Sequence, residues 1–502
     1  MKILKTKRLL IFCVAVIVVI FMFLIACNRA ENTNTPNPGE IPGNTENGGE
    51  PEEAEENYSL TDERSKVPDN IEAEDMNGMK IRLITRSDME YEFFSEEETG
   101  DNVEDAIYRR NKKIEERFNI EFVSVPVADP SGSVSKSVKA EDNAYELIGH
   151  NTVNIAGLSL TGALLNFHTI DTVDLSQKWF MQDAVNEVTV NNKLYILPGE
   201  ACISILEYTY CYFFNKALIS DYGLENPYQL VLDGTWTLDK VSEIIKGMYK
   251  DLDNDGMKSP GDFYGLATFN ISHPVVYTYS SGMRITKTNA GGIPEFVVPS
   301  EKLYTNFEKV FNMSCNTLDT FDWYLAPGDI NAQKVSSRNA FKNKLALFQT
   351  ESIIMAKELR DMEDDFGIVP YPKYDKAQEK YYTYADGHSS MFGIPITVQE
   401  PRKIGKILVA LNAESWKTVV PEYYDVAIKV KFVRDDESVR VLDILLDGRV
   451  FDFGYIYDNW NAYGFYMWDL FTRNDNNVAS YFEKRQPNAE KHLAKTLEFF
   501  EG

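Results

Sequence analysis

The sequence predicts an α/β protein with two lobes, each built around its own sheet. A chain of 502 residues is longer than one ordinary hydrophobic core can serve, so two lobes are expected. Residues 80–127 follow a strand, helix, strand pattern, which implies two parallel strands joined by a right-handed crossover. The aromatic run from Tyr208 to Phe214 lacks period-two alternation, as is typical of a strand buried on both faces.

The elements of the first lobe follow from local patterns. Lys80 to Thr85 predicts a first strand, NIEFVSVPV a second, and AYELIGH a third. Between the first two strands, residues 102–118 place apolar side chains at helical spacing, and the basic residues of this helix are expected to point mostly outward. The apolar positions are Val103, Ile107, Ile114 and Phe118, and the basic ones are Arg109, Arg110, Lys112 and Lys113.

The crossing between the lobes is predicted from Asn191 onward. A polar turn precedes a short apolar strand, Leu194 to Leu197, and a Pro198-Gly199-Glu200 break separates it from the aromatic strand. Further on, a helix is expected over Leu238 to Tyr249, and two more over residues 402–432 and 435–446.

The amino terminus has the pattern of a secretion signal. A basic stretch precedes an apolar run of 17 residues, Leu9 to Ile25, just short of the ~18 that suggest a membrane-spanning helix. The run ends in Leu24-Ile25-Ala26-Cys27, which resembles a bacterial lipobox. That resemblance implies cleavage before Cys27 and a diacylglycerol thioether on its thiol. Residues 28–57 contain no aromatic residue and are expected to form a disordered tether.

The charge of the chain excludes some partners. The formal charge is −26, and removal of the leader, with four basic and no acidic residues, leaves 47 basic and 77 acidic residues, or −30. Such a surface repels nucleic acid and anionic membrane faces. Three cysteines outside the leader and lipobox, Cys202, Cys211 and Cys315, show no CxxC spacing. Cys202 and Cys211 either pair or remain buried free thiols.

Several segments together resemble family 1 extracellular solute-binding proteins, the group of maltose-binding protein. The resemblance rests on VNNKLYILPGE, on YFFNKALISDYGLENPYQLVLDGTWTLDK, and on AFKNKLALFQTE and DFGIVPYPKYDKAQEKYY. It implies a two-lobed periplasmic-binding-protein-like fold (type II) whose lobes close over a ligand about hinges near 198–203 and 369–384. It also implies a binding lipoprotein on the extracytoplasmic face of the cell membrane. Its expected partners are a carbohydrate and the permease subunits of an ABC importer.

The domain boundaries expected from this resemblance divide the chain into four parts. These are a signal peptide (1–26), a lipidated terminus and tether (27–76), lobe 1 (77–200 plus 380–430) and lobe 2 (201–379 plus 431–502).

Ligand-binding residues are expected where loops leave the carboxyl ends of strands, and at the crossings. The candidates are Arg86, Asp88, His150, Asn151, Glu200, Asp386 and His388, with Trp323 as a stacking platform. Sugar rings stack on aromatic side chains, and the chain also supplies Trp179, Trp236, Trp460 and Trp468.

The sequence contains none of the motifs HExxH, GxSxG, GxxxxGK[ST] or GxGxxG, and its five histidines are scattered. We therefore predict a binding protein without catalytic residues and without a required cofactor. A carbohydrate-active hydrolase or lyase, a peptide-binding lipoprotein and a cell-wall scaffold remain as alternatives.

One loop matches part of a calcium-binding pattern. Residues 251–262 place aspartates at positions 1, 3 and 5 and glycine at position 6 of a calcium loop. The expected ligands of a structural Ca²⁺ are Asp251, Asp253, Asp255, the carbonyl of Met257, and Asp262. Asp at position 12 is one methylene shorter than the usual Glu, and Pro260 constrains the exit of the loop.

Overall fold

The computed structural model describes residues 64–269, 272–424, 436–458 and 463–501. All of them belong to one compact unit of the chain, residues 58–502. Cys27, Trp460 and residues 28–57 of the predicted tether lie outside the described residues. None of the described helices is long and apolar enough to cross a membrane.

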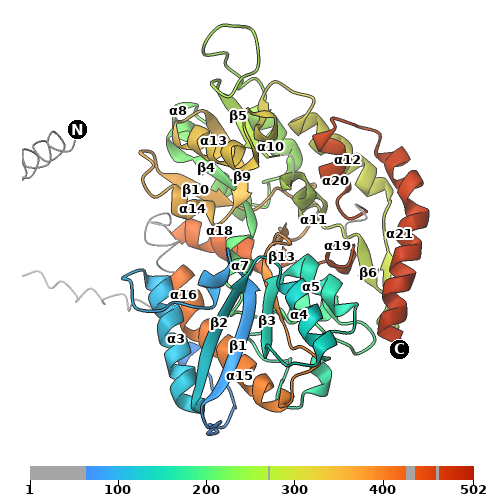
Figure 1. Cartoon of the computed structure of the whole chain (residues 1–502). Helices are drawn as coiled ribbons and strands as arrows, with labels where there is room; N and C mark the ends of the chain where they lie inside the picture. The colour runs from blue at the N-terminus through green and yellow to red at the C-terminus, as the bar shows by residue number, and fades with distance from the viewer. Residues whose placement is uncertain (1–63, 270–271, 425–435, 459–462, 502) are drawn as a thin grey trace, which may run out of the picture. The chain divides into compact units, whose positions relative to one another are not determined.

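The first sheet has the strand order β12-β3-β1-β2 (Figure 1). The strands β1 (Met79–Arg86), β2 (Ile120–Val127) and β3 (Leu147–Asn151) are parallel, while β12 (Ser390–Gly393) runs antiparallel to β3. The three strands predicted for the first lobe are therefore confirmed, as is the parallel pairing of the first two. The fourth strand comes from a distant part of the sequence.

The helix α3 (Asn102–Phe118) connects β1 to β2 as predicted. The Asp101 side chain accepts hydrogen bonds from two backbone N–H groups of its first turn, and Asn119, at φ 48°, ends it. The expectation that Arg110 points outward is wrong, because this side chain is 1% exposed. Its guanidinium donates to the Phe93 carbonyl (2.8 Å) and to Ser415 Oγ (3.0 Å), and these bonds make burial of the charge tolerable.

The second sheet has the order β10-β4-β9-β5-β8. Its strands are β4 (Tyr210–Asn215), β5 (Tyr264–Thr268), β8 (Thr320–Asp322), β9 (Ala346–Ser352) and β10 (Phe366–Val369). Every residue of β4 is buried, so the burial predicted for the aromatic strand is confirmed. The ring of Tyr212 packs edge-on against Trp236 and Tyr371, with centroids 5.9 and 4.9 Å apart.

Helices, turns and short strands make up the rest of the described secondary structure. The helices up to the second sheet's last strand are α4 (Pro130–Ala140), α5 (Thr152–Ser159), α6 (Gln182–Val188), α7 (Ser204–Glu207), α8 (Lys216–Asp221), α9 (Pro227–Leu232), α10 (Leu238–Ile245), α11 (Val276–Ser280), α12 (Glu301–Ser314), α13 (Ile330–Lys342) and α14 (Met355–Glu358). The later helices are α15 (Pro401–Glu414), α16 (Val420–Glu422), α18 (Asp436–Asp447), α19 (Phe453–Ile456), α20 (Tyr466–Thr472) and α21 (Val478–Glu501). The 3₁₀ turns are η1 (Glu90–Glu92), η2 (Phe167–Thr169), η3 (His273–Val275) and η4 (Trp323–Leu325), and η5 (Ser415–Val419) is a π-helical turn between α15 and α16. The short strands are β6 (Thr286–Thr288), β7 (Pro294–Phe296), β11 (Thr383–Tyr384) and β13 (Arg449–Val450).

The chain passes twice between the two sheets within the part described. It leaves the first sheet after Leu197 and enters the second at Tyr210, and it returns between Val369 and Ser390. The strand predicted over Leu194 to Leu197 is reduced to an isolated bridge between Leu197 and Phe392, because Pro198 and Gly199 turn the chain away at once. Between the two sheets, Thr209 pairs with Ala385, so the passages lie side by side.

A buried amide fixes the first passage to α15. Asn412 Oδ1 accepts a hydrogen bond from the Ala201 N–H at 3.0 Å, and its Nδ2 donates to the Leu408 carbonyl at 2.8 Å. Gly199 has to lack a side chain here, since a Cβ would lie 2.1 Å from Asn412 Oδ1.

We expect Asn412→Ala to lower the free energy of unfolding by about 1–3 kcal/mol, because it leaves the buried Ala201 N–H without an acceptor. Guanidinium denaturation measures this change. Asn339→Ala, at an exposed position of α13, is the matched control and should change stability little. Equal stabilities of the two variants would contradict the role given to Asn412.

Candidate functional site

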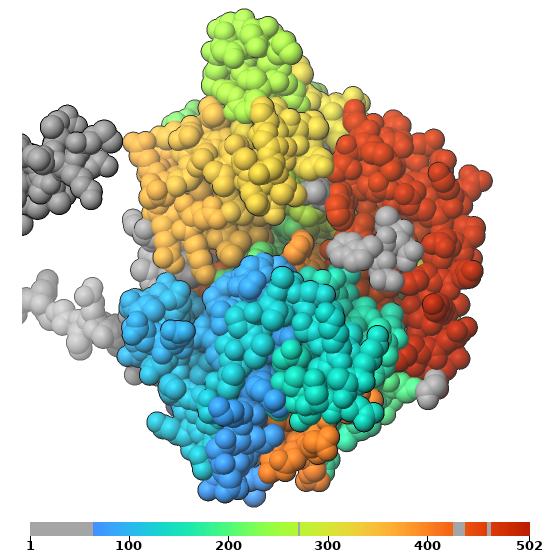
Figure 2. Space-filling view, in the orientation of Figure 1, coloured from blue at the N-terminus to red at the C-terminus, as the bar shows by residue number. Residues whose placement is uncertain are grey.

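Five of the predicted ligand-binding residues, Arg86, Asp88, His150, Asp386 and His388, meet between the two sheets. Arg86 ends β1, His150 lies near the end of β3, and Asp386 and His388 lie in the loop between β11 and β12. The charge of Arg86 lowers the pKa of both His150 and His388, so its guanidinium acts on both rings. Figure 2 shows the surface hollowed where the blue to cyan part of the chain approaches the yellow to orange part.

Arg86 and Asp88 form an ion pair at the end of β1. The Arg86 guanidinium donates from Nε to Asp88 Oδ1 at 3.0 Å and from Nη2 to Oδ2. Although partial burial raises the pKa of Asp88, the hydrogen bond and charge of Arg86 leave it below its usual range. The third nitrogen, Nη1, is buried and has no hydrogen-bond partner among the described residues.

Asp386 lies at the centre of a hydrogen-bonded group. Its Oδ1 accepts from the His388 N–H (2.9 Å) and pairs with His388 Nδ1 (2.5 Å), while its Oδ2 accepts from the Tyr210 hydroxyl (2.5 Å). Burial raises the pKa of Asp386, but the charge and hydrogen bonds of His388 bring it well below its usual range. The charge of Asp386 in turn raises the pKa of His388.

His150 is a neutral, buried histidine. The side chain is 3% exposed, and burial, with the nearby charge of Arg86, lowers its pKa to about 4. Its Nδ1 is buried without a hydrogen-bond partner in the part of the chain described. The neighbouring Asn151 is already engaged, since its side chain caps α5 by accepting from the Asn154 N–H at 2.8 Å.

The indole of Trp323 follows the carboxyl end of β8. It is 2% exposed and packs against Phe321 with ring centroids 4.9 Å apart, so neither ring face is open in this conformation. Trp179 and Trp236 are fully buried in the core and likewise offer no face for stacking. The indole nitrogen of Trp323, Nε1, is buried and has no hydrogen-bond partner among the described residues.

Two residues that the sequence did not single out belong near this site. Tyr208 follows α7 between the two sheets, is partly exposed, and directs its hydroxyl to Met89 Sδ at 3.8 Å. Lys334 on α13 is exposed, and its charge lowers the pKa of His388 and of His273. The aromatic run around Tyr208 was a usable signal, whereas a surface lysine on a helix gives none.

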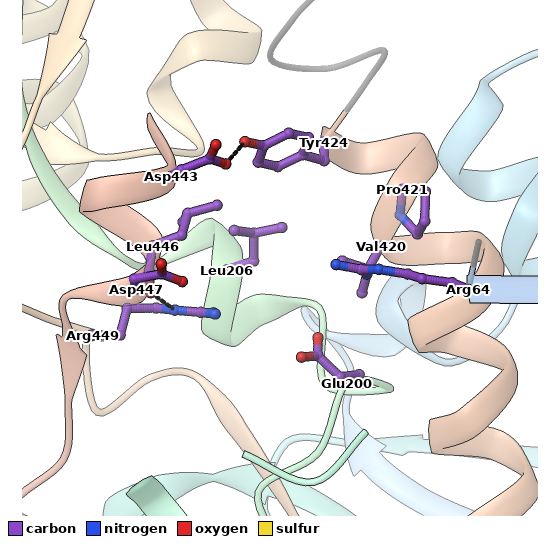
Figure 3. A pocket seen from close by; sticks show the side chains of 10 residues that line it. All are labelled: Arg64, Glu200, Leu206, Val420, Pro421, Tyr424, Asp443, Leu446, Asp447 and Arg449. Atoms are coloured by element: carbon purple, nitrogen blue, oxygen red, sulfur yellow. Dashed lines mark hydrogen bonds between the residues drawn. The ribbon is translucent and has the colours of Figure 1, made fainter. Parts of the chain in front are cut away.

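Glu200 lies apart from this group. It lines a separate cavity together with residues of α7, α16, α18 and β13 (Figure 3). The charges that act on its carboxylate are those of Arg449 and Arg64, and none of the residues around Arg86 is among them.

Comparison with known proteins identifies the fold. No model of a known protein family matches the chain, and no curated protein sequence matches it. The ABC substrate-binding protein Lmo0181 from Listeria monocytogenes, in complex with cycloalternan, has a TM-score of 0.51 and 13% identity, and the match covers 84% of this chain and 100% of that chain. Maltose-bound T. maritima MalE3 has a TM-score of 0.50 and 15% identity, again over 84% of this chain and 100% of that chain.

The chain has the fold of ABC substrate-binding proteins. The two-lobed fold class expected from the sequence is therefore confirmed, although identities this low show the fold alone. Within the ABC substrate-binding fold, the proposed domain boundaries remain a prediction. Cys202 and Cys211 are both buried free thiols, so of the two alternatives for this pair the structure has the unpaired one.

The candidate calcium loop brings three carboxylates together. Ligand oxygens of Asp251, Asp253 and Asp255 lie within 4.8 Å of one another. Asp262, predicted as the twelfth ligand, is engaged elsewhere. Its Oδ1 accepts from the Leu252 N–H (3.0 Å) and its Oδ2 from the Ser259 N–H (2.9 Å).

The carbonyl of Met257 is also engaged, since it accepts from the Tyr249 hydroxyl at 3.2 Å. The loop thus brings the carboxylates of Asp251, Asp253 and Asp255 together while Asp262 holds it closed. Asp251 likewise accepts from the Asn254 and Gly256 N–H groups at 2.7 and 2.8 Å, and the calcium site stays a prediction.

Stability should depend on pH through His388. Because the folded state raises the pKa of His388, its stabilising contribution is complete below the pKa of the unfolded chain, about 6.5, and is lost as pH rises through the folded pKa. We expect His388→Asn to lower the free energy of unfolding by about 0.5–1 kcal/mol near pH ~5.5, a size typical of a pair with one exposed partner, and little near pH ~9. His168→Asn is the control, since burial lowers the pKa of that ring and no carboxylate raises it. A loss for His388→Asn that is the same at both pH values would contradict the ion pair.

The loop of residues 251–262 allows a separate test. Calorimetry of the chain with Ca²⁺ should give binding heat that is lost in Asp253→Asn and retained in Asp262→Asn. Asp262→Asn should instead lower the melting temperature, because an amide nitrogen would then face a backbone N–H. Absence of heat with the unaltered chain would show that the three aspartates are only an acidic turn.

Proposed function

We propose that this chain is an extracytoplasmic solute-binding lipoprotein that captures a carbohydrate by closing its two lobes and delivers it to an ABC importer. The observation that carries the proposal is a set of buried polar atoms without protein partners between the two sheets. Arg86 Nη1, His150 Nδ1 and Trp323 Nε1 are all of this kind among the described residues.

Such atoms are uncommon because an unpaired buried polar group costs free energy. They come from both sheets, since Arg86 and His150 lie on the first and Trp323 follows β8 of the second. A ligand rich in hydroxyl groups would supply partners to Arg86 and His150, which lie close enough for the charge of Arg86 to lower the pKa of His150. The two matching structures named above each hold a saccharide, cycloalternan in one and maltose in the other, and this supports the same ligand class here.

The location and the importer are part of the proposal. The lipobox-like sequence ending in Cys27 supports a lipid anchor, and the ABC substrate-binding fold supports a permease as partner. The proposed role is binding without chemical transformation, which the substrate-binding proteins of similar fold support.

Thermal-shift measurements on the purified full chain, kept in a mild detergent, test this function. We expect maltose or cycloalternan to raise the melting temperature, since a ligand bound only by the folded state adds about 2.7 kcal/mol at 100 times its Kd. A panel of short peptides is run in parallel. Stabilisation by peptides alone would favour the peptide-binding alternative, and release of shortened saccharides would favour the hydrolase.

The variants Arg86→Gln and Lys80→Gln form a matched pair on β1. Arg86 ends the strand at the site, whereas Lys80 lies near its other end and pairs with Glu121 on the surface. We expect Arg86→Gln to weaken binding of the saccharide found by thermal shift by about 1.5–3 kcal/mol, the usual contribution of a hydrogen bond from a charged group. Calorimetry measures both affinities, and equal values would remove Arg86 from the binding site.

A further inference from the structure

A second cavity lies beside the passages between the sheets, apart from the site around Arg86. Its volume is about 180 Å³. The polar residues that line it are Arg64, Glu200, Tyr424, Asp443, Asp447 and Arg449, and the apolar ones are Leu206, Val420, Pro421 and Leu446. Figure 3 shows the Glu200 carboxylate and the Arg449 and Arg64 guanidinium groups directed into it from different sides.

Glu200 and Arg449 carry opposite charges but do not touch. The Glu200 carboxylate makes no hydrogen bond or ion pair within the described part of the chain. Arg449 donates from Nε to the Leu446 carbonyl at 2.9 Å, and its two terminal nitrogens have no partner among the same residues. Burial raises the pKa of Glu200 and lowers that of Arg449, and the charge of each residue opposes this shift in the other without cancelling it.

Two of the remaining charges of the cavity, Arg64 and Asp443, have partners of their own, whereas the Asp447 carboxylate has none among the described residues and acts on Arg449 through its charge. Arg64 donates from Nη1 to the Trp416 carbonyl at 2.9 Å and lies over the Trp416 ring. Asp443 accepts a hydrogen bond from the Tyr424 hydroxyl. Glu200 and Arg449 remain the opposite charges that a bound molecule could bridge, with Asp447 as a second carboxylate acting on Arg449. Two opposite charges held apart in a partly dehydrated cavity keep their desolvation cost without a direct bond.

We propose that this cavity binds a small dipolar ion, specifically an α-amino acid with a short aliphatic side chain. The ammonium group would bind Glu200, and the side chain would lie against Leu206 and Leu446. The carboxylate would bind Arg449, because a planar guanidinium donates two parallel hydrogen bonds to a carboxylate. The bound molecule would contact the first passage through Glu200. It would contact the second indirectly, because β13, which contains Arg449, pairs with β11. This site is distinct from the proposed saccharide site and does not depend on it.

Calorimetry on the full chain in mild detergent, with L-alanine and L-valine as probes, tests the proposal. Two blocked derivatives separate the two charges, since L-alaninamide lacks the carboxylate and N-acetyl-L-alanine lacks the ammonium group. We expect binding of the free amino acids and a loss of affinity of about tenfold or more with either derivative. Absence of binding by both free amino acids would overturn the proposal, and so would binding of either derivative with the affinity of the free amino acid.

Variants test whether the probe occupies this cavity. Glu200→Gln and Arg449→Gln should each weaken amino-acid binding by about tenfold or more, whereas Glu121→Gln, a surface glutamate on β2, should not. If Arg449→Gln fails to fold, Arg449→Lys and Glu200→Gln decide. Unchanged affinity in Glu200→Gln would overturn the assignment, as would amino-acid binding that disappears only in His388→Asn, since that result would place the probe in the other site.

Discussion

The pairing of the two passages between the sheets is the constraint on which the site depends. The Asp386 N–H donates to the Tyr208 carbonyl at 3.0 Å, and Thr383 Oγ1 donates to the Tyr210 carbonyl at 2.6 Å. These bonds join residues more than 170 positions apart and hold Asp386 against the Tyr210 hydroxyl. Because the passages also connect the lobes, the same bonds position polar groups and limit how the lobes can move.

Burial and charge act against each other throughout the site. Asp386 and His388 each favour the ionised form of the other, because each supplies the other with a charge and a hydrogen bond. Burial and the charge of Arg86 instead lower the pKa of His150 to about 4. The chain as a whole is strongly acidic, yet two of the groups whose charges act on His388, Arg86 and Lys334, are basic. An uncharged ligand rich in hydroxyl groups suits this mixture of acceptors and donors better than a strongly charged one does.

The second cavity differs from the site in how its charges are arranged. Around Asp386 the opposite charges touch, so that group is complete in the folded protein. Across the cavity of Figure 3, Glu200 and Arg449 face each other without a direct bond. Whether a carboxylate is paired depends on where the fold places the opposite charge, so the Asp386 carboxylate is paired and, among the described residues, the Glu200 carboxylate is not.

The sequence by itself determined the elements whose signal is local. The strands β1, β2 and β3, the helix α3 and the buried strand β4 follow from apolar periodicity over a few residues, and so does the expectation that Arg86 and His150 lie at strand ends. Tertiary structure alone decided which of these polar groups meet. It placed Glu200 in another cavity, covered Trp323, buried Arg110 and assigned Asp262 to closing its own loop. The physical reason is that exposure and ion pairing depend on contacts between residues hundreds of positions apart, and such contacts leave no trace in local periodicity.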